Sequence, residues 1–240
     1  MDFETATKPD KEKQKRIEII DALRGFAVIL MVCHHFLYDL VEFLDAPEWL
    51  FSNPVFDILQ PFFASVFIVL CGVSANFSRS NIKRGVFTLA VAICITGVTA
   101  ILEMPIIFGV LHLLSVCMIF YGVTHRLWEK MPKPVLLIFC ILGILISSYC
   151  VKNIEVQSEN LWVFGWQYDG FVSYDYFPLF PWIFVFLFGT WLGYYIKENR
   201  FPEWFYKIKI LVLSFIGRHA LVVYIIHQPV LYGITMLLGG

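Results

Sequence analysis

The chain has 240 residues, of which 59% are hydrophobic, 18% aromatic and only 15% charged, with a formal net charge of −1. Soluble domains contain about 45–50% apolar and about 25% charged residues, so a soluble globular protein is excluded, and the abundance of Leu, Ile, Val and Phe excludes a disordered one. A net charge near zero provides no field that would gather nucleic acid.

Residues 1–15 are polar and have no apolar period, which predicts a disordered cytoplasmic tail. The rest, 16–240, is expected to form one transmembrane domain, because a membrane-spanning helix needs about 20 mostly apolar residues and seven segments reach that length. These segments are residues 19–43, 55–77, 84–102, 106–125, 134–151, 176–196 and 212–237. The sequence therefore predicts an all-α, polytopic membrane helical bundle, with a polar and aromatic loop at 152–175.

Lys and Arg are divided unequally between the two predicted sides. The tail and alternate loops hold 15 of the 18 Lys and Arg residues, the opposite side holds only Lys152, and Arg24 and Arg218 lie at or within predicted spans. This bias predicts a cytoplasmic N-terminus and an external C-terminus. The external side is acidic, with Asp45, Glu48, Asp57, Glu103, Glu155, Glu159, Asp169 and Asp175. We expect a multi-pass protein of the cell membrane, the bacterial inner (plasma) membrane.

The cysteines occur singly in apolar runs, without the Cys or His spacing of a zinc site. They are Cys33, Cys71, Cys94, Cys117, Cys140 and Cys150. We expect buried free thiols, with no disulfide framework and no metal.

Ionisable residues within spans are costly and indicate functional sites by default. The first predicted helix holds Asp21 and Arg24, three residues apart and able to form a local ion pair, and later His34, His35 and Asp39. His35 and Asp39 lie one turn apart on one face, so the carboxylate is expected to orient the imidazole as a base. The alternative is a pair of satisfied core histidines, and this alternative is favoured for His34, which points about 100° away.

Two further histidines are expected at a similar depth. At 1.5 Å per residue, His35 lies about 22 Å above the cytoplasmic face and His112 about 9 Å below the outer face of a core about 30 Å thick. His227, followed by Gln228, lies between mid-depth and the outer third. Three helices thus bring imidazoles to one layer, although each histidine alone is also consistent with a structural role.

The cytoplasmic half is basic. A guanidinium fork suits phosphate, which favours a phosphate-bearing ligand there, while the positive-inside rule alone also explains cations in loops. The candidate phosphate ligands are Arg24, Arg79, Lys83, Arg84 and Arg218.

Several stretches resemble one enzyme family. The first helix, RIEIIDALRGFAVILMVCHHFLYDL (16–40), resembles the first helix of the heparan-α-glucosaminide N-acetyltransferase catalytic-domain family, including its short bacterial members. The spacing from Arg24 to His35 also resembles the Arg–His motif of the broader acyltransferase-3 group. Residues 108–114, 176–193 and 216–233 are similar to the same family.

The resemblance implies that an acetyl group moves from cytosolic acetyl-CoA to an amino or hydroxyl sugar across the membrane. It implies acetyl-CoA as donor substrate and a sugar or glycan acceptor, with membrane lipid around the protein. The chain has no large luminal domain, and its first external loop lacks the histidine that the animal enzymes place there. The catalytic assignment therefore rests on the first helix.

Together these observations predict a mechanism. His35, oriented by Asp39, would act as general base or as a transient acetyl carrier. His112 or His227 would stabilise the oxyanion, and Gln228, Asp57 and Glu103 would face the acceptor. A secondary transporter or proton-coupled protein would use the same His and Asp residues, and a non-catalytic scaffold is a further alternative. The sequence leaves the oligomeric state open, with a homo-oligomer among the options.

Overall fold

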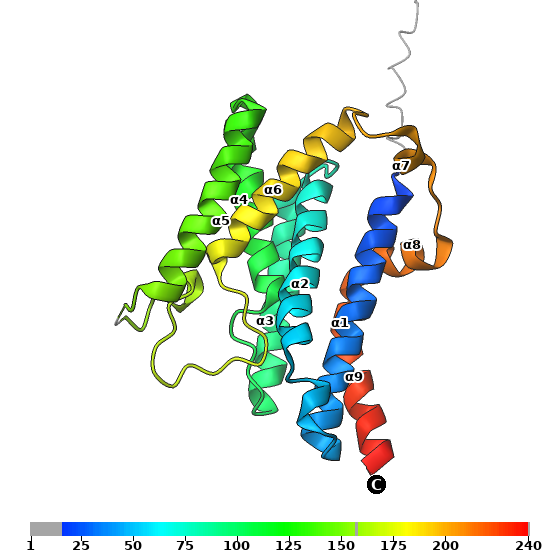
Figure 1. Cartoon of the computed structure of the whole chain (residues 1–240), viewed down its shortest axis with the longest axis vertical. Helices are drawn as coiled ribbons and strands as arrows, with labels where there is room; N and C mark the ends of the chain where they lie inside the picture. The colour runs from blue at the N-terminus through cyan, green and yellow to red at the C-terminus, as the bar shows by residue number, and fades with distance from the viewer. Residues whose placement is uncertain (1–15, 157, 240) are drawn as a thin grey trace, which may run out of the picture.

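A computed structural model describes residues 16–156 and 158–239, and the predicted tail 1–15 lies outside the described residues. The described part is all-helical, and seven of its helices are long and apolar enough to cross a membrane, which confirms the predicted fold class (Figure 1). These helices are α1 (Glu18–Leu44), α2 (Pro54–Ala75), α3 (Asn81–Ile101), α4 (Val110–Lys130), α5 (Lys133–Asn153), α6 (Leu179–Lys197) and α9 (Ala220–Gly239). The shorter elements are η1 (Glu48–Leu50), η2 (Trp162–Phe164), α7 (Glu203–Lys207) and α8 (Leu211–Arg218).

The spanning helices form two groups (Figure 1). On one side, α1 packs against α8 and α9; on the other, α6 packs against α2 and α5, while α3 packs against α4. The contact of α1 with α2 joins the two groups.

Glycines allow the closest helix contacts. A Cβ on Gly217 of α8 would overlap the carbonyl oxygen of Asp21 on α1, and a Cβ on Gly25 would overlap the carbonyl oxygen of Leu213. Between α2 and α6, Gly72 and Gly189 approach the partner backbone in the same way. Small residues at such crossings let two backbones meet closely where lipid provides no hydrophobic force between helices.

The prediction of one continuous span over residues 212–237 is wrong. The structure divides it at His219, whose φ of −104° and ψ of 18° depart from helical values, into α8 and α9. The break lets α8 lie against the first turns of α1, where the Ser214 hydroxyl donates to the Glu18 carbonyl at 3.1 Å. The spanning part therefore begins at Ala220.

Two other helices begin later than predicted. The structure starts α4 at Val110 instead of residue 106, and α6 at Leu179 instead of residue 176. The segments before them run side by side, since the Phe177 amide donates to the Phe108 carbonyl at 2.8 Å and the Tyr174 amide to the Pro105 carbonyl at 3.1 Å. This pairing satisfies backbone groups that a longer helix would otherwise have bonded internally.

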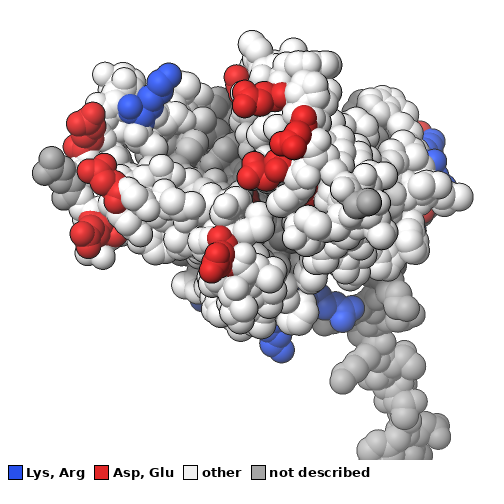
Figure 2. All heavy atoms as spheres, turned by 90° about the horizontal axis from the view of Figure 1, so that it is seen from below, with Lys and Arg blue, Asp and Glu red and all other residues white. Residues whose placement is uncertain are grey.

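The two ends of the bundle differ in charge. The acidic end carries Asp45, Glu48, Asp57, Glu103, Glu155, Glu159, Asp169 and Asp175. Asp57 is in the first turn of α2, and the others lie in the loops that follow α1, α3 and α5. Viewed onto this end, Asp and Glu are spread over the surface among few Lys or Arg (Figure 2). The basic end carries Arg79, Lys83, Arg84, Arg126, Lys130, Lys133, Lys197, Arg200, Lys207, Lys209 and Arg218.

Candidate functional site

A cavity of about 1430 Å³ lies in the acidic-end half of the bundle. Its wall comes from α1, α2, α3 and α9 and from the paired segments 104–110 and 174–177, and most of that wall is apolar. Among its polar side chains are His34, His35, His227 and Gln228. Two helices that are far apart in the sequence thus contribute their histidines to one cavity.

His35 and His227 lie next to each other, with ring centroids 5.0 Å apart. The Nδ1 atom of His227 is 2.7 Å from the Tyr224 carbonyl, a contact that requires the proton on Nδ1. In the neutral ring Nε2 is then a proton acceptor, and this atom is buried without a hydrogen-bond partner in the described structure. The pair can therefore accept a proton from a group in the cavity.

Asp39 has a different partner from the one predicted. Its side chain is fully buried, and Oδ1 accepts a hydrogen bond from the Gln228 amide at 2.8 Å, whereas the described structure has no hydrogen bond between Asp39 and His35. The reason is that α9 packs on this face of α1 and brings an amide donor to the carboxylate. Asp39 Oδ2 and Gln228 Oε1 are buried without a partner among the described residues, but only Gln228 lines the cavity. Of these two side chains, Gln228 is therefore the one that a polar ligand in the cavity can reach.

His34 and His112 face other neighbours than the His35–His227 pair does, although the His34 and His35 ring centroids are 5.9 Å apart. The His34 ring packs on Phe51 at 4.8 Å, on a different face of α1 from Asp39, as its position in the helix predicts. His112, which was predicted at the depth of His35, is directed into the contact between α4 and α3, where Nε2 is 3.3 Å from the Thr96 hydroxyl. His112 is therefore not among the side chains that line the cavity.

Two acidic candidates also lie away from the cavity. Asp57 in the first turn of α2 and Glu103 just after α3 are both exposed at the acidic end, and neither lines the cavity. α2 begins at the surface near Asp57, and α3 ends at the surface just before Glu103. Both side chains therefore point to solvent instead of to His35.

Asp175 is the acidic residue that does reach the cavity, and the sequence singled it out only as one of several external acids. Its Oδ2 accepts from the Tyr224 hydroxyl at 2.9 Å and from the Val110 amide at the start of α4 at 3.1 Å. Burial raises the pKa of this carboxyl, and the hydrogen bonds from Tyr224 and Val110 partly oppose that shift. Asp175 thus ties α4 to α9 one turn from His227.

Replacing Asp175 by Asn tests this tie. Because the folded state raises the pKa, it favours the protonated carboxyl; that stabilisation is complete below the ordinary pKa of about 3.9 and is lost as pH rises through the folded-state pKa. Asn keeps an acceptor without a charge, so the variant should gain thermal stability over the wild type as pH rises from about 4 to 7. Thermal unfolding in detergent across this pH range measures it.

Asp175→Ala is the matched control, because it leaves the Tyr224 hydroxyl and the Val110 amide without their acceptor. It should lose about 1–3 kcal/mol relative to the wild type near pH 4, and this deficit should shrink as pH rises, because only the wild type carries the titrating carboxyl. An Asn variant whose difference from the wild type is independent of pH would contradict the assignment.

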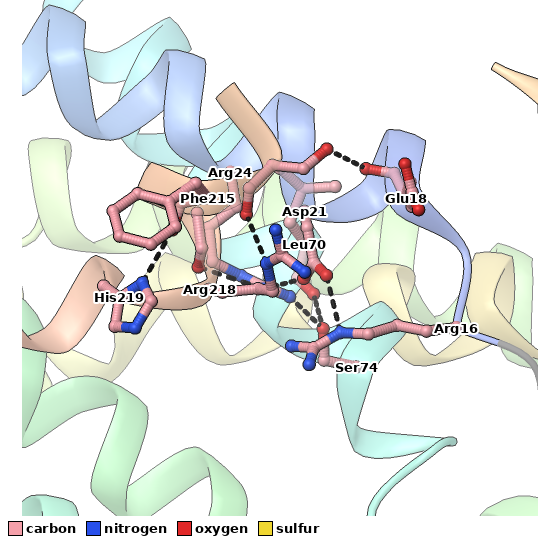
Figure 3. A network of polar contacts seen from close by, with 11 residues as sticks. Arg16, Glu18, Asp21, Arg24, Leu70, Ser74, Phe215, Arg218 and His219 are labelled. Atoms are coloured by element: carbon pink, nitrogen blue, oxygen red, sulfur yellow. Dashed lines mark hydrogen bonds and ion pairs between the residues drawn. The ribbon is translucent and has the colours of Figure 1, made fainter. Parts of the chain in front are cut away.

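At the basic end, Arg24 is the centre of a polar network (Figure 3). It donates to Asp21 Oδ1 at 2.8 Å and to the Ser74 hydroxyl of α2, and lies 3.5 Å from the Gly217 carbonyl of α8. Arg16 donates to the other oxygen of Asp21 at 2.7 Å. The predicted Asp21–Arg24 pair is thus confirmed, and it joins three helices.

The other predicted phosphate ligands are more accessible. Arg218 lies beside this network, is exposed, and uses only Nε in a 3.2 Å contact to the Ser214 carbonyl (Figure 3). Arg84 is close enough to Arg24 for their charges to interact, and Arg79 and Lys83 are exposed on the same end. The structure therefore gathers Arg218 and Arg84 around Arg24.

A search with family models matches the chain to the heparan-alpha-glucosaminide N-acetyltransferase, catalytic, model over residues 16–229. The match runs from the Arg24 network at the start of α1 to the His227–Gln228 pair in α9. No curated protein and no solved structure gave a significant match. Because the family model covers most of the chain and both halves of the site, this protein is a member of the heparan-alpha-glucosaminide N-acetyltransferase catalytic-domain family.

Proposed function

We propose that the protein transfers an acetyl group from acetyl-CoA, bound at the basic end in the cytoplasm, to an amino or hydroxyl sugar at the acidic end. The family implies transmembrane acetyltransferase activity in general. The observation that supports the specific reaction is the His35–His227 pair on the wall of a large cavity, together with the network around Arg24 at the basic end of the same bundle.

In this reaction His35 acts as the general base. As the acceptor nitrogen or oxygen attacks the thioester carbonyl, its proton passes to the imidazole and the new C–N or C–O bond forms. The C–S bond then breaks, and the CoA thiolate takes the proton from the imidazolium. The unprotonated Nε2 of His227 suits the same proton relay better than an oxyanion site.

The basic end supplies the donor site in this proposal. The exposed guanidinium of Arg218 and the cations around it suit the phosphates of CoA. From Arg24 to His35 is eleven residues of α1, or about 16 Å, which the pantetheine arm would span within the bundle. The thioester would then meet the acceptor in the cavity.

Replacing Arg218 by Ala should weaken acetyl-CoA binding by about tenfold or more, because a charge-assisted phosphate contact is lost. Stability should change little, since the side chain is exposed and holds only one backbone carbonyl. The shift in melting temperature on adding acetyl-CoA measures donor affinity, because a ligand of the folded state stabilises it.

Arg200→Ala is the control, as Arg200 is exposed at the same end and pairs with Glu198 at 2.8 Å. Its acetyl-CoA response should equal that of the wild type. An undiminished response in Arg218→Ala would remove Arg218 from the donor site, and a wild type with no response to acetyl-CoA would contradict the proposed function itself.

A further inference from the structure

The cavity is built unlike a site for a free sugar. Its wall is mostly apolar, and its polar side chains include His35, His227 and Gln228 on α1 and α9, Gln60 on α2 and Thr99 on α3. At about 1430 Å³ it also exceeds the roughly 300–1,000 Å³ of pockets that hold drug-sized ligands. The space suits a ligand with a small polar part and a long apolar part.

The apolar walls lead to the seam between α3 and α9. These helices face each other across the cavity, yet α3 packs against α4 and α9 against α1 and α8. Apolar side chains of both helices line the cavity and are exposed, among them Val98 on α3, Leu102 directly after it and Ile225 on α9. Since both helices are membrane spans, an opening between them faces the acyl chains of the bilayer.

We propose that the acceptor is a sugar carried on a lipid, which enters sideways through the α3–α9 seam. Its amine or hydroxyl would reach His35 and His227 while its apolar tail stays between Val98 and Ile225. This inference rests on the proposed acetyl transfer and specifies its substrate class.

Depth favours this acceptor over a free sugar. His35 is nine residues before the end of α1, about 14 Å inside the acidic end. A free sugar would have to leave water and pass apolar walls, losing hydrogen bonds on the way. A lipid-borne sugar keeps its tail in hydrocarbon throughout, and its hydroxyls would meet Gln228, which lines the cavity and whose Oε1 atom has no partner in the described structure.

The test compares two acceptors in proteoliposomes: glucosamine and dodecyl glucosaminide, each with radiolabelled acetyl-CoA. The wild type should show a KM at least tenfold lower for the dodecyl acceptor. Narrowing the seam by Val98→Trp or Ile225→Trp should raise that KM at least tenfold and change the KM for glucosamine less than twofold.

Ile93→Trp and Ile226→Trp are matched controls, because these residues are exposed on the same helices but do not line the cavity. Both control variants should have the wild-type KM for each acceptor. The dodecyl chain concentrates the acceptor in the bilayer equally for all variants, so a difference between seam and control variants reports the lateral path and not this partition. Seam variants that match these controls, or equal use of the two acceptors by the wild type, would overturn the lateral path.

A photolabel keeps this test independent of turnover. Dodecyl glucosaminide with a diazirine at the end of its tail should crosslink to α3 and α9 around Val98 and Ile225, in competition with the unlabelled glycoside. Labelling spread over all lipid-facing helices contradicts the proposal. Seam labelling without acetyl transfer to either acceptor would support the path and refute only the proposed reaction.

Discussion

Replacing His35 by Ala should lower acetyl transfer by at least 100-fold while the protein still folds, inserts and binds acetyl-CoA. General-base catalysis contributes about 10²–10⁴ in rate, and His35 faces the cavity 5.0 Å from His227, well away from the arginines of the basic end. Initial rates with radiolabelled acetyl-CoA measure the loss, and the melting-temperature shift on adding acetyl-CoA reports donor binding.

His34→Ala is the matched control, since His34 lines the same cavity but packs on Phe51. It should be the milder change. An inactive His34→Ala beside an active His35→Ala would show that the wrong face of α1 was assigned. If His227→Ala alone is inactive, the base is the Nε2 atom of His227.

Replacing Gly217 by Val should disrupt the fold rather than the chemistry. Any Cβ at this position meets the Asp21 carbonyl, so α8 must move away from α1, and with it the Gly217 carbonyl near Arg24. Overpacking of this kind typically costs about 1–3 kcal/mol. We expect the upper end of this range, because the new side chain would meet backbone atoms, which cannot move aside as a flexible side chain can. Thermal unfolding in detergent measures it.

Gly233→Val is the matched control, because a Cβ at that position of α9 has no atom within 4 Å apart from its chain neighbours and the backbone of its own helix. It should leave the free energy of unfolding within about 1 kcal/mol of the wild-type value. Equal stability of the two variants would show that the α1–α8 contact is looser than the structure has it.

The seven spans could be predicted because apolar length is a local property of the sequence. The Asp21–Arg24 pair was equally accessible, since a spacing of three residues places both side chains on one helix face. The break at His219 was not, because it depends on α8 folding back onto α1. Gly217 was the one local sign of that contact, and a glycine has many other uses.

The site shows the same limit. Depth arithmetic correctly brought His35 and His227 to one level, but depth leaves rotation about the helix axis undetermined. In the orientation that α4 adopts about its axis, His112 faces Thr96 on α3. In the orientation that α1 adopts, Asp39 faces α9, where the Gln228 amide donates to it. Asp175 was hidden for a related reason: only the packing of α4 against the 174–178 segment shows that this loop carboxylate enters the cavity.

The most direct measurement uses sealed proteoliposomes that hold glucosamine and dodecyl glucosaminide inside, with the basic end of the protein outward. Acetyl-CoA labelled in the acetyl group is then added outside only. The account predicts acetylated acceptor inside the vesicles, formed at the rate at which free CoA appears outside, and none with His35→Ala. Product that forms only when acetyl-CoA and acceptor share one side, or solute flux without CoA release, would contradict transfer across the membrane.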